Sequence, residues 1–301
     1  MRADLPRIHR QQYWVGPKTD GVRALLVCSF VATRGTEDEL EYCVLVDRTG
    51  RMAMLPADVI APEPAYSGTL VDGELTWDGR DETPLTFTAF DVVAVNGYSM
   101  RHHAHSIRQV HLKRFIHSVF VPRKSRLVLA AKQWVRLQDG DDTTTTADAD
   151  MLTALATSAT SDGLILAPEN GAPLRAGRQR DHFKWKVAHH HTVDMVCDGT
   201  TTWWLESAGV RVLASDALGV ELRMGESSSL PVGHTTDTVV ECALTLLTED
   251  GRASVVRPPH AAVWLVHPVR LRPDKLHAND ATVARATLQN IRESILIHEL
   301  L

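Results

Sequence analysis

Lys18-Thr-Asp-Gly-Val-Arg23 leads directly into an apolar run, Val22 to Ala32, which predicts a β-strand. A lysine in such a place is usually a solvated side chain. Here the turn Asp20-Gly21 that follows it is able to aim one amine into a pocket. An amine can attack phosphorus when nearby positive charge or desolvation lowers its pKa.

The composition of the whole chain excludes several classes of protein. The chain has 301 residues, a formal charge of −5, 44% hydrophobic and 23% charged residues, which predicts one large or two ordinary globular domains. These values exclude a disordered chain, a collagen-like repeat and a coiled coil. No apolar run is long enough to span a bilayer, and the first ten residues lack the apolar segment of a secretory signal, so we expect no membrane and no secretion. Four cysteines without a C-x-x-C pair predict reduced, mostly buried thiols in an intracellular protein.

The mild acidity argues against a protein that holds nucleic acid by bulk charge, although it allows a local basic cleft. Only seven of the 32 Lys and Arg residues are lysines, so arginine supplies most of the positive charge and each lysine is a candidate for a specific role. Four of the seven, Lys18, Lys184, Lys186 and Lys275, lie in short motifs.

Five further motifs follow Lys18 along the chain. Each has an ordinary interpretation when taken alone, such as a tight turn with exposed acids or an aromatic residue in the core. Each also suits nucleotide chemistry: paired carboxylates can hold a metal or a ribose, an aromatic ring can stack on a base, and two lysines two apart on a strand can face one phosphate. The motifs are Leu70-Val-Asp-Gly-Glu-Leu75, the strand Phe87 to Gly97 with Phe90-Asp91, Ser161-Asp-Gly-Leu-Ile-Leu-Ala167, Lys184-Trp-Lys186 and Arg270-Leu-Arg-Pro-Asp-Lys275.

The pattern of apolar residues and turns predicts a mixed α/β region followed by short strands. Expected strands cover 22–32, 41–46, 69–77, 85–95, 162–167 and 183–187, and expected helices cover 106–119 and 151–159. The acidic stretch 139–150 is predicted to be an exposed loop. From about residue 192 the pattern becomes all-β and fits a barrel of about five strands, and a closing helix begins near Asn279-Asp280.

The order of the six motifs resembles that of the covalent nucleotidyltransferase superfamily, which comprises polynucleotide ligases and mRNA capping guanylyltransferases. The resemblance extends from Lys18 to Asn279, and three features are similar to the capping branch. Lys184-Trp-Lys186 leads into Thr192-Val-Asp194, Val239-Val-Glu-Cys242 resembles a strand of the family's barrel, and Arg270-Leu-Arg-Pro-Asp-Lys-Leu-His-Ala-Asn279 resembles its R-x-R-x-D-K-x-x-x-N signature. Pro273 and Ala278 depart from the residues usual at their positions.

The resemblance implies an α+β fold: a nucleotidyltransferase domain of the ATP-grasp-like ligase and capping type, built of antiparallel sheets with helices, plus an OB-fold barrel. The implied domains are 1–192 for the nucleotidyltransferase domain, 193–278 for the OB-fold, and 279–301 for a helix that packs back on the first domain. The implied reaction joins GMP from GTP to the Lys18 amine and passes it to the 5′-diphosphate end of RNA.

The resemblance also assigns roles to single residues. Those implied to act in catalysis are Lys18, Asp162, Lys184, Lys186, Arg272, Asp274 and Lys275. Those implied to hold the nucleotide are Thr19, Arg23, Glu74, Phe90, Lys184 and Lys186, with Phe90 stacked on guanine. Those implied to lie at a Mg²⁺ or Mn²⁺ ion are Asp72, Glu74 and Asp162.

Two alternatives remain open. An ATP-dependent DNA or RNA ligase shares most of these motifs and forms lysyl-AMP, and an inactive nucleotidyltransferase fold can serve as a binding module. If the chain is a capping enzyme, separate proteins must supply the RNA triphosphatase and cap methyltransferase activities, and an RNA polymerase tail is a candidate recruiter. The expected location is then the nucleus of a cell, or the host cell or viral factory for a viral protein.

Overall fold

The computed structural model describes residues 2–32, 39–77, 83–137, 148–158, 160–177, 179–187, 190–199, 202–226, 228–247 and 263–301. It confirms the α+β class with antiparallel sheets. The chain forms two compact units, one of Arg7–Trp185 with Leu301 and one of Met1–Pro6 with Lys186–Leu300. In the described residues, no helix has the length and apolarity needed to cross a membrane.

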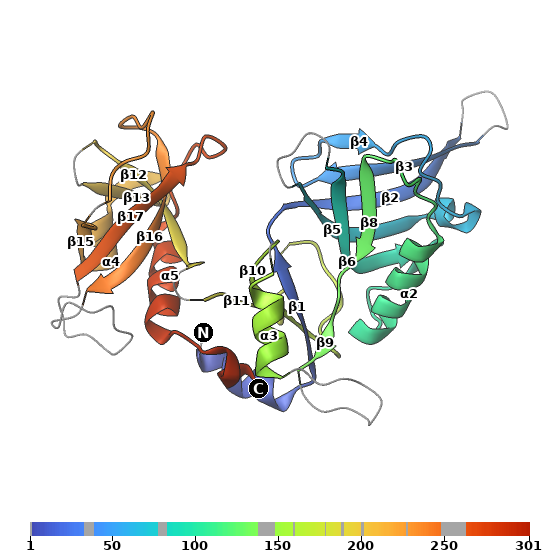
Figure 1. The fold of residues 1–301 in the computed structure, drawn as a ribbon, viewed down its shortest axis with the longest axis horizontal. Helices are drawn as coiled ribbons and strands as arrows, with labels where there is room; N and C mark the ends of the chain where they lie inside the picture. Colours follow the sequence, from blue (N-terminus) through green and yellow to red (C-terminus); the bar gives the residue numbers. More distant parts are fainter. Residues whose placement is uncertain are drawn as a thin grey trace. The chain divides into compact units, whose positions relative to one another are not determined.

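The first unit contains two sheets (Figure 1). Its elements are α1 (Leu5–Arg10, which begins in the other unit), β1 (Tyr13–Thr19), β2 (Val22–Ala32), β3 (Glu39–Asp47), β4 (Met52–Met54), β5 (Thr69–Thr76), β6 (Leu85–Val95), β7 (Tyr98–Ser99), α2 (His105–Ser118), β8 (Leu127–Ala131), β9 (Val135–Arg136), α3 (Ala149–Ala156), β10 (Ser161–Pro168) and β11 (Phe183–Trp185).

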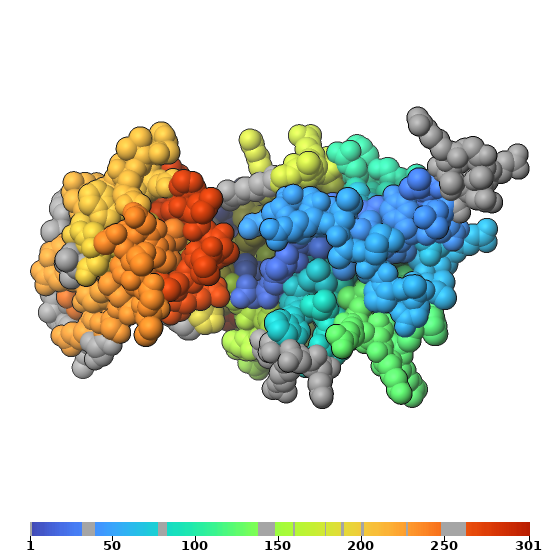
Figure 2. All heavy atoms as spheres, turned by 90° about the horizontal axis from the view of Figure 1, so that it is seen from above, coloured from blue at the N-terminus to red at the C-terminus, as the bar shows by residue number. Residues whose placement is uncertain are grey.

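The larger sheet has the strand order β4-β3-β2-β5-β6-β7, with β8 parallel to β6. Alternation decides which side chains of β2 enter the core: Ala24, Leu26 and Cys28 are buried, whereas the residues between them, Leu25 and Val27, are only partly buried. Helix α2 covers this core with Leu112 and neighbouring apolar residues. In the space-filling view, the strands of this sheet supply the blue and cyan surface of the unit (Figure 2). The predicted strands 22–32 and 41–46 are confirmed as β2 and β3, which pair in antiparallel orientation.

The smaller sheet has the order β11-β10-β1-β9 and carries Lys18. Helix α3 packs on β10 and β1 through the buried Leu152. Asp148 begins this helix by accepting a hydrogen bond from the Met151 amide at 2.7 Å. The rest of the acidic stretch predicted as a loop lies largely outside the described residues.

The second unit is built on one six-stranded sheet of order β14-β13-β12-β16-β17-β15. Its core contains Trp203 and Trp264. The chain passes from β14, at one edge of the sheet, through α4 to β15, at the other edge. The OB-fold remains a prediction with which this order agrees. The elements are β12 (Thr192–Cys197), β13 (Trp203–Ser207), β14 (Val210–Leu213), α4 (Ala214–Leu218), β15 (Glu221–Met224), β16 (Val239–Leu247), β17 (Val263–Leu271) and α5 (Ala281–Glu293).

The closing helix differs from the prediction. We expected it to pack on the first domain, but Ala281, Ala284 and Leu288 of α5 belong to the core of the second unit. Ala284, Leu288 and Ile291 recur at helical spacing in the sequence, and this apolar stripe predicts one buried face without indicating against which core it packs. The division between the units also falls at residues 185 and 186 rather than 192, and Met1–Pro6 belongs to the second unit. In that unit Arg2 pairs with Glu299 and donates to the Glu293 carbonyl oxygen at 3.0 Å.

Candidate active site

Lys18 lies at an irregularity in the pairing of β1 with β10. Pro17 pairs with Leu164 and Thr19 with Ser161, so Lys18 stands opposite two residues, Asp162 and Gly163. Such a β-bulge re-aims the side chains beside it. Gly163 has a φ of 143°, which a residue with a Cβ rarely adopts.

The bulge brings the Lys18 amine onto the Asp162 carboxylate, where it donates a hydrogen bond within an ion pair. The two side chains are 17% and 24% exposed, so the pair is sheltered yet open to a ligand. The prediction placed Lys18 just before a strand, whereas it lies within β1. The turn follows it, held by the Asp20 amide donating to the Thr160 carbonyl at 2.9 Å.

Arg23 and the acidic motif of β5 form the next part of the site. Arg23 on β2 donates two hydrogen bonds to Asp72, one of them from Nε to Oδ1 at 2.9 Å. Burial raises the pKa of the Asp72 carboxyl, and the Arg23 guanidinium opposes this effect. Glu74 pairs in register with Arg23 across the strands. Burial raises the pKa of Glu74 as well, against the opposing cations of Lys132 and Lys18.

The glycine between these two acids has a packing role. A Cβ on Gly73 would lie 2.3 Å from Cζ of Phe87, which is fully buried. Only a glycine allows β5 to approach the Phe87 ring this closely while both neighbours keep their carboxylates in the site.

Lys132 belongs to the site although it lies in none of the six sequence motifs. It is 4% exposed, and its amine donates to the Pro17 carbonyl oxygen at 2.8 Å, next to Lys18. The amine also lies 5.3 Å from the centre of the Phe90 ring. Burial lowers the pKa of Lys132 to about 8, with Glu74 opposing and Lys18 adding to the shift. The scarcity of lysines was the one signal in the sequence that pointed to it.

Phe90 keeps a partly exposed ring beside these cations. The Gln109 side-chain amide donates to the Phe90 carbonyl oxygen at 2.8 Å, which fixes the strand at this point. The Arg23 guanidinium lies 5.9 Å from the ring centre on the same site. Thr19, which was expected to contact the nucleotide, is buried and alternates to the face of β1 opposite Lys18.

The two predicted phosphate-binding lysines are divided between the units. Lys184 lies on β11 opposite Ile165, which lies opposite Gly16, so Lys184 and Lys18 share one face of the smaller sheet. Strand β11 ends at Trp185, and Lys186 belongs to the second unit. The predicted strand that would hold both lysines on one face is therefore shorter than expected.

The predicted basic cluster of the second unit is held by carboxylates. Arg272 donates to Asp274 at 2.9 and 2.8 Å and to Asp194 at 3.1 Å, and Lys275 pairs with Asp194. The hydrogen bonds from Arg272 lower the pKa of Asp274 to about 2. Asp194 is the acid of the Thr-Val-Asp motif, so two motifs far apart in sequence form one ionic cluster.

Asn279, the last residue of the R-x-R-x-D-K-x-x-x-N signature, also binds Asp194 of this cluster. The Asp194 amide donates to Oδ1 of Asn279, and the Asn279 amide donates to the Asp194 carbonyl oxygen, both at 2.8 Å. The side-chain oxygen of Asn279 therefore accepts from one backbone amide while its own backbone amide forms the second bond.

The expected divalent metal can be tested against these residues. Across the part of the chain that the structure describes, no three His, Cys, Asp or Glu side chains form a metal-binding group. Asp72 is engaged on both oxygens by Arg23. Glu74 and Asp162 each lie near Lys18 and offer the hard oxygens that Mg²⁺ prefers. One or two carboxylates with substrate phosphates suffice for such an ion, so this pair fits it and Asp72 does not.

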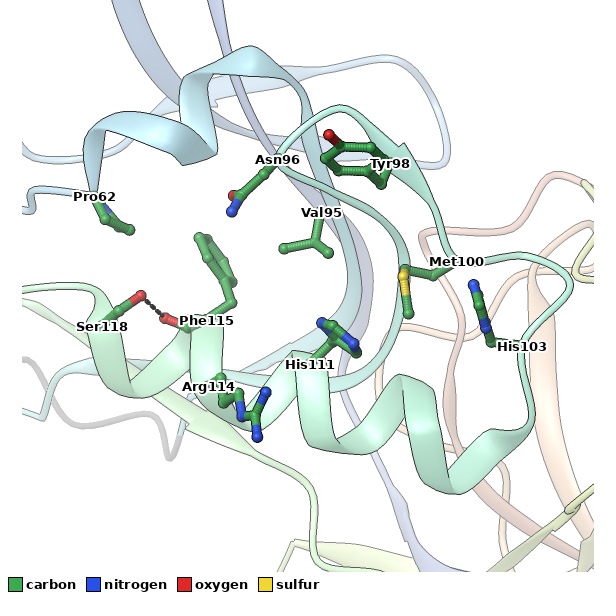
Figure 3. Close-up of a pocket in the computed structure, with 10 residues that line it drawn as sticks. All are labelled: Pro62, Val95, Asn96, Tyr98, Met100, His103, His111, Arg114, Phe115 and Ser118. Atoms are coloured by element: carbon green, nitrogen blue, oxygen red, sulfur yellow. Dashed lines mark hydrogen bonds between the residues drawn. The ribbon is translucent and has the colours of Figure 1, made fainter.

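A hollow of about 490 Å³ lies elsewhere in the first unit, between the β6–β7 hairpin and α2. Figure 3 shows Phe115 and Val95 within it and Arg114 at its rim. Lys18 and Phe90 do not line it. We assign no part of the nucleotide site to this hollow.

The match of residues 1–188 to a family model places the chain among the nucleotidyltransferases. More narrowly, the chain belongs to the mRNA capping enzyme family, because the family model "mRNA capping enzyme, catalytic domain" matches residues 1–188. The mRNA-capping enzyme subunit alpha of Kluyveromyces lactis is 30% identical over 206 residues, which make up 61% of this chain and 42% of that protein. The chain thus spans less than half the length of this relative. The family predicted from the motifs is confirmed.

Two solved structures are similar to this chain. A mycobacterial DNA ligase D complexed with ATP and MES is 17% identical, with 88% of this chain and 90% of that chain covered and a TM-score of 0.48. An archaeal ATP-dependent RNA ligase is 15% identical, with 62% and 46% covered and a TM-score of 0.36.

Proposed function

We propose that this chain is an RNA guanylyltransferase that works through a lysyl-GMP intermediate. The observation that carries the proposal is the Lys18 amine, held by Asp162 within a chain of the capping family. Glu74 lies close enough to Lys18 for the lysine charge to act on its carboxyl, and the Arg23 guanidinium lies 5.9 Å from the centre of the Phe90 ring, which supports the proposal.

In the first step the Lys18 amine attacks the α-phosphorus of GTP. A P–N bond forms, the bond from the α-phosphorus to the bridging oxygen breaks, and pyrophosphate leaves. The Asp162 carboxylate, which already accepts a hydrogen bond from this amine, receives the proton. A Mg²⁺ or Mn²⁺ ion held by Glu74 and Asp162 would neutralise charge on the phosphates.

In the second step an oxygen of the RNA 5′-diphosphate attacks the same phosphorus. The P–N bond breaks, GMP passes to the RNA, and the amine recovers its proton. Lys184, on the same face of the sheet as Lys18, supplies positive charge for the phosphates. Arg272 and Lys275 of the second unit supply further cations suited to pyrophosphate.

The choice of guanine over adenine rests on Lys132. Its ammonium group can only donate hydrogen bonds, and it lies beside the Phe90 ring on which the base would stack. Guanine presents the acceptor O6 where adenine presents the donor N6 amine. A guanine stacked on Phe90 with its O6 toward Lys132 would accept a hydrogen bond from this buried donor, so we infer that Lys132 favours GTP and disfavours ATP.

The function also implies partners. The RNA end must reach this chain as a diphosphate, so we infer that a separate RNA triphosphatase acts before it and a cap methyltransferase acts after it. The K. lactis relative is itself described as a subunit of a capping enzyme.

Covalent labelling tests the proposal. The purified chain is incubated with Mg²⁺ or Mn²⁺ and α-labelled GTP or ATP, with Lys18→Ala and Lys132→Met beside it. We expect acid-labile label from GTP alone, none in Lys18→Ala, and a reduced preference for GTP in Lys132→Met. Label from ATP alone would make the chain a ligase, and no label from either nucleotide would make it a binding module.

A further inference from the structure

The loop between β10 and β11 is rich in arginine and leaves the sheet that carries Lys18. It begins after Pro168, on the strand that holds Asp162, and returns at Phe183, next to Lys184. Its yellow-green atoms stand at the surface of the first unit (Figure 2). We use the name basic rim for four exposed residues in or against this loop: Arg101, Arg175, Arg180 and Lys184.

The protein holds this loop in a defined position. Arg101 donates from Nε to the Leu174 carbonyl oxygen at 2.6 Å, and the Leu174 amide donates to the Arg101 carbonyl oxygen at 3.1 Å. The buried Asp181 accepts from the Ala172 amide at 2.7 Å, and the Tyr13 hydroxyl donates to the Asp181 carbonyl oxygen at 3.2 Å. The arginines therefore project from a fixed scaffold.

Arg175 and Arg180 of the basic rim are exposed. The two acids of this region, Glu169 and Asp181, are 9% and 5% exposed and accept hydrogen bonds from the protein itself. With the described carboxylates, neither Arg175 nor Arg180 forms an ion pair. In a chain whose net charge is −5, such a group of exposed cations selects a polyanion.

The sheet sets the path that such a polyanion would follow. Lys18 and Lys184 share one face, and the loop leaves the end of the sheet near Tyr13. Tyr13 lies five positions before Lys18 on β1, which corresponds to about 17 Å along the strand. A strand whose 5′ end lies at Lys18 passes Lys184 and reaches the loop after a few nucleotides.

We propose that the basic rim binds the phosphate backbone of the RNA acceptor, downstream of its 5′-diphosphate. This inference rests on the proposed guanylyltransferase function. It assigns the loop to the second step, because the loop leaves the sheet opposite Tyr13, at the other end of β1 from Lys18, along the path of a longer acceptor strand.

The test compares two arginine pairs of the first unit. The variant Arg175→Gln/Arg180→Gln is set against Arg48→Gln/Arg51→Gln, whose arginines are exposed on the turn between β3 and β4. We expect both variants to form lysyl-GMP as the parent does. The rim variant alone should show a KM for a long 5′-diphosphate RNA raised roughly threefold to thirtyfold, with the KM for a diphosphate dinucleotide unchanged.

Salt dependence supplies a second readout. For single-stranded RNA the slope of log affinity against log salt should fall in magnitude by about 1.4, since each lost phosphate contact removes about 0.7. Equal effects of the two pairs, or a rim variant with the parent's KM and slope, would overturn the proposal. If the parent forms no lysyl-GMP, the proposed function fails. Fluorescence anisotropy with a single-stranded RNA then still decides whether the rim binds it.

Discussion

Replacing Lys132 with methionine should stabilise the protein while it weakens the enzyme. Lys132 carries its charge at 4% exposure, and its pKa falls from 10.5 to about 8. The unfolded state therefore binds the proton more tightly, and the charge costs about 3 kcal/mol of stability at pH 7. The variant also loses the hydrogen bond to the Pro17 carbonyl oxygen, which lowers its stability by about 1 kcal/mol. The net gain in stability of Lys132→Met at pH 7 is therefore about 2 kcal/mol.

The lowered pKa of Lys132 also determines how the stability difference between the parent and Lys132→Met changes with pH. Between pH 8 and 10.5 the unfolded state holds the proton that the folded state has lost, so this term makes the parent more stable as pH rises. The cost of the charge falls to about 1.4 kcal/mol at pH 9.5. The advantage of Lys132→Met should thus shrink by about 2 kcal/mol between pH 7 and 9.5.

Urea unfolding at the two pH values measures this, with Lys113→Met on the exposed face of α2 as the matched control. The control should change little at either pH. A variant less stable than the parent at both pH values, or one whose advantage stays constant, would refute the reasoning. Loss of GTP labelling in the more stable variant would show that this lysine serves function at the expense of stability.

Two other substitutions test packing and charge. Gly73→Ala should lower the free energy of unfolding by about 1–3 kcal/mol because its Cβ meets the Phe87 ring, and adding Phe87→Leu should recover part of the loss in urea unfolding; an unchanged midpoint would contradict the contact. Asp194→Asn should cost about 1–3 kcal/mol in the second unit, because Arg272 and Lys275 lose their shared carboxylate. Hydrogen exchange should quicken in β12 and β17 and stay unchanged in β2 and β5, whereas a uniform change would show a general loss of stability.

Local pattern was sufficient to predict most elements of the first unit. The strand of 22–32 and the helix of 106–119 were predicted because alternation and helical spacing are properties of neighbouring residues. The β-bulge at Lys18 was not predictable, since it depends on how two strands 140 residues apart are registered. The six motifs identified candidate residues of the site. They did not predict which carboxylate each cation contacts.

Lys132 and α5 show a different limit. Lys132 lies between an apolar strand and a tryptophan, and its sequence gives no indication that it reaches the carbonyl of Pro17, 115 residues away. The apolar stripe of α5 was visible, but a stripe is equally able to pack on either core. Partners distant in sequence are determined by the tertiary fold, which local pattern does not contain.

The mutual hydrogen bonds of Asp194 and Asn279 make the chain between them a closed ring, although no covalent bond joins its ends. Insertions between these two residues cost little, since each doubling of the number of residues in the closed segment costs only about 0.6 kcal/mol in closure entropy. A shift of one residue at either end would break both bonds at once. The number of residues between the two motifs can therefore vary. Arg272 and Lys275 lie close before Asn279 in the sequence, so these bonds keep them beside Asp194 whatever that number is.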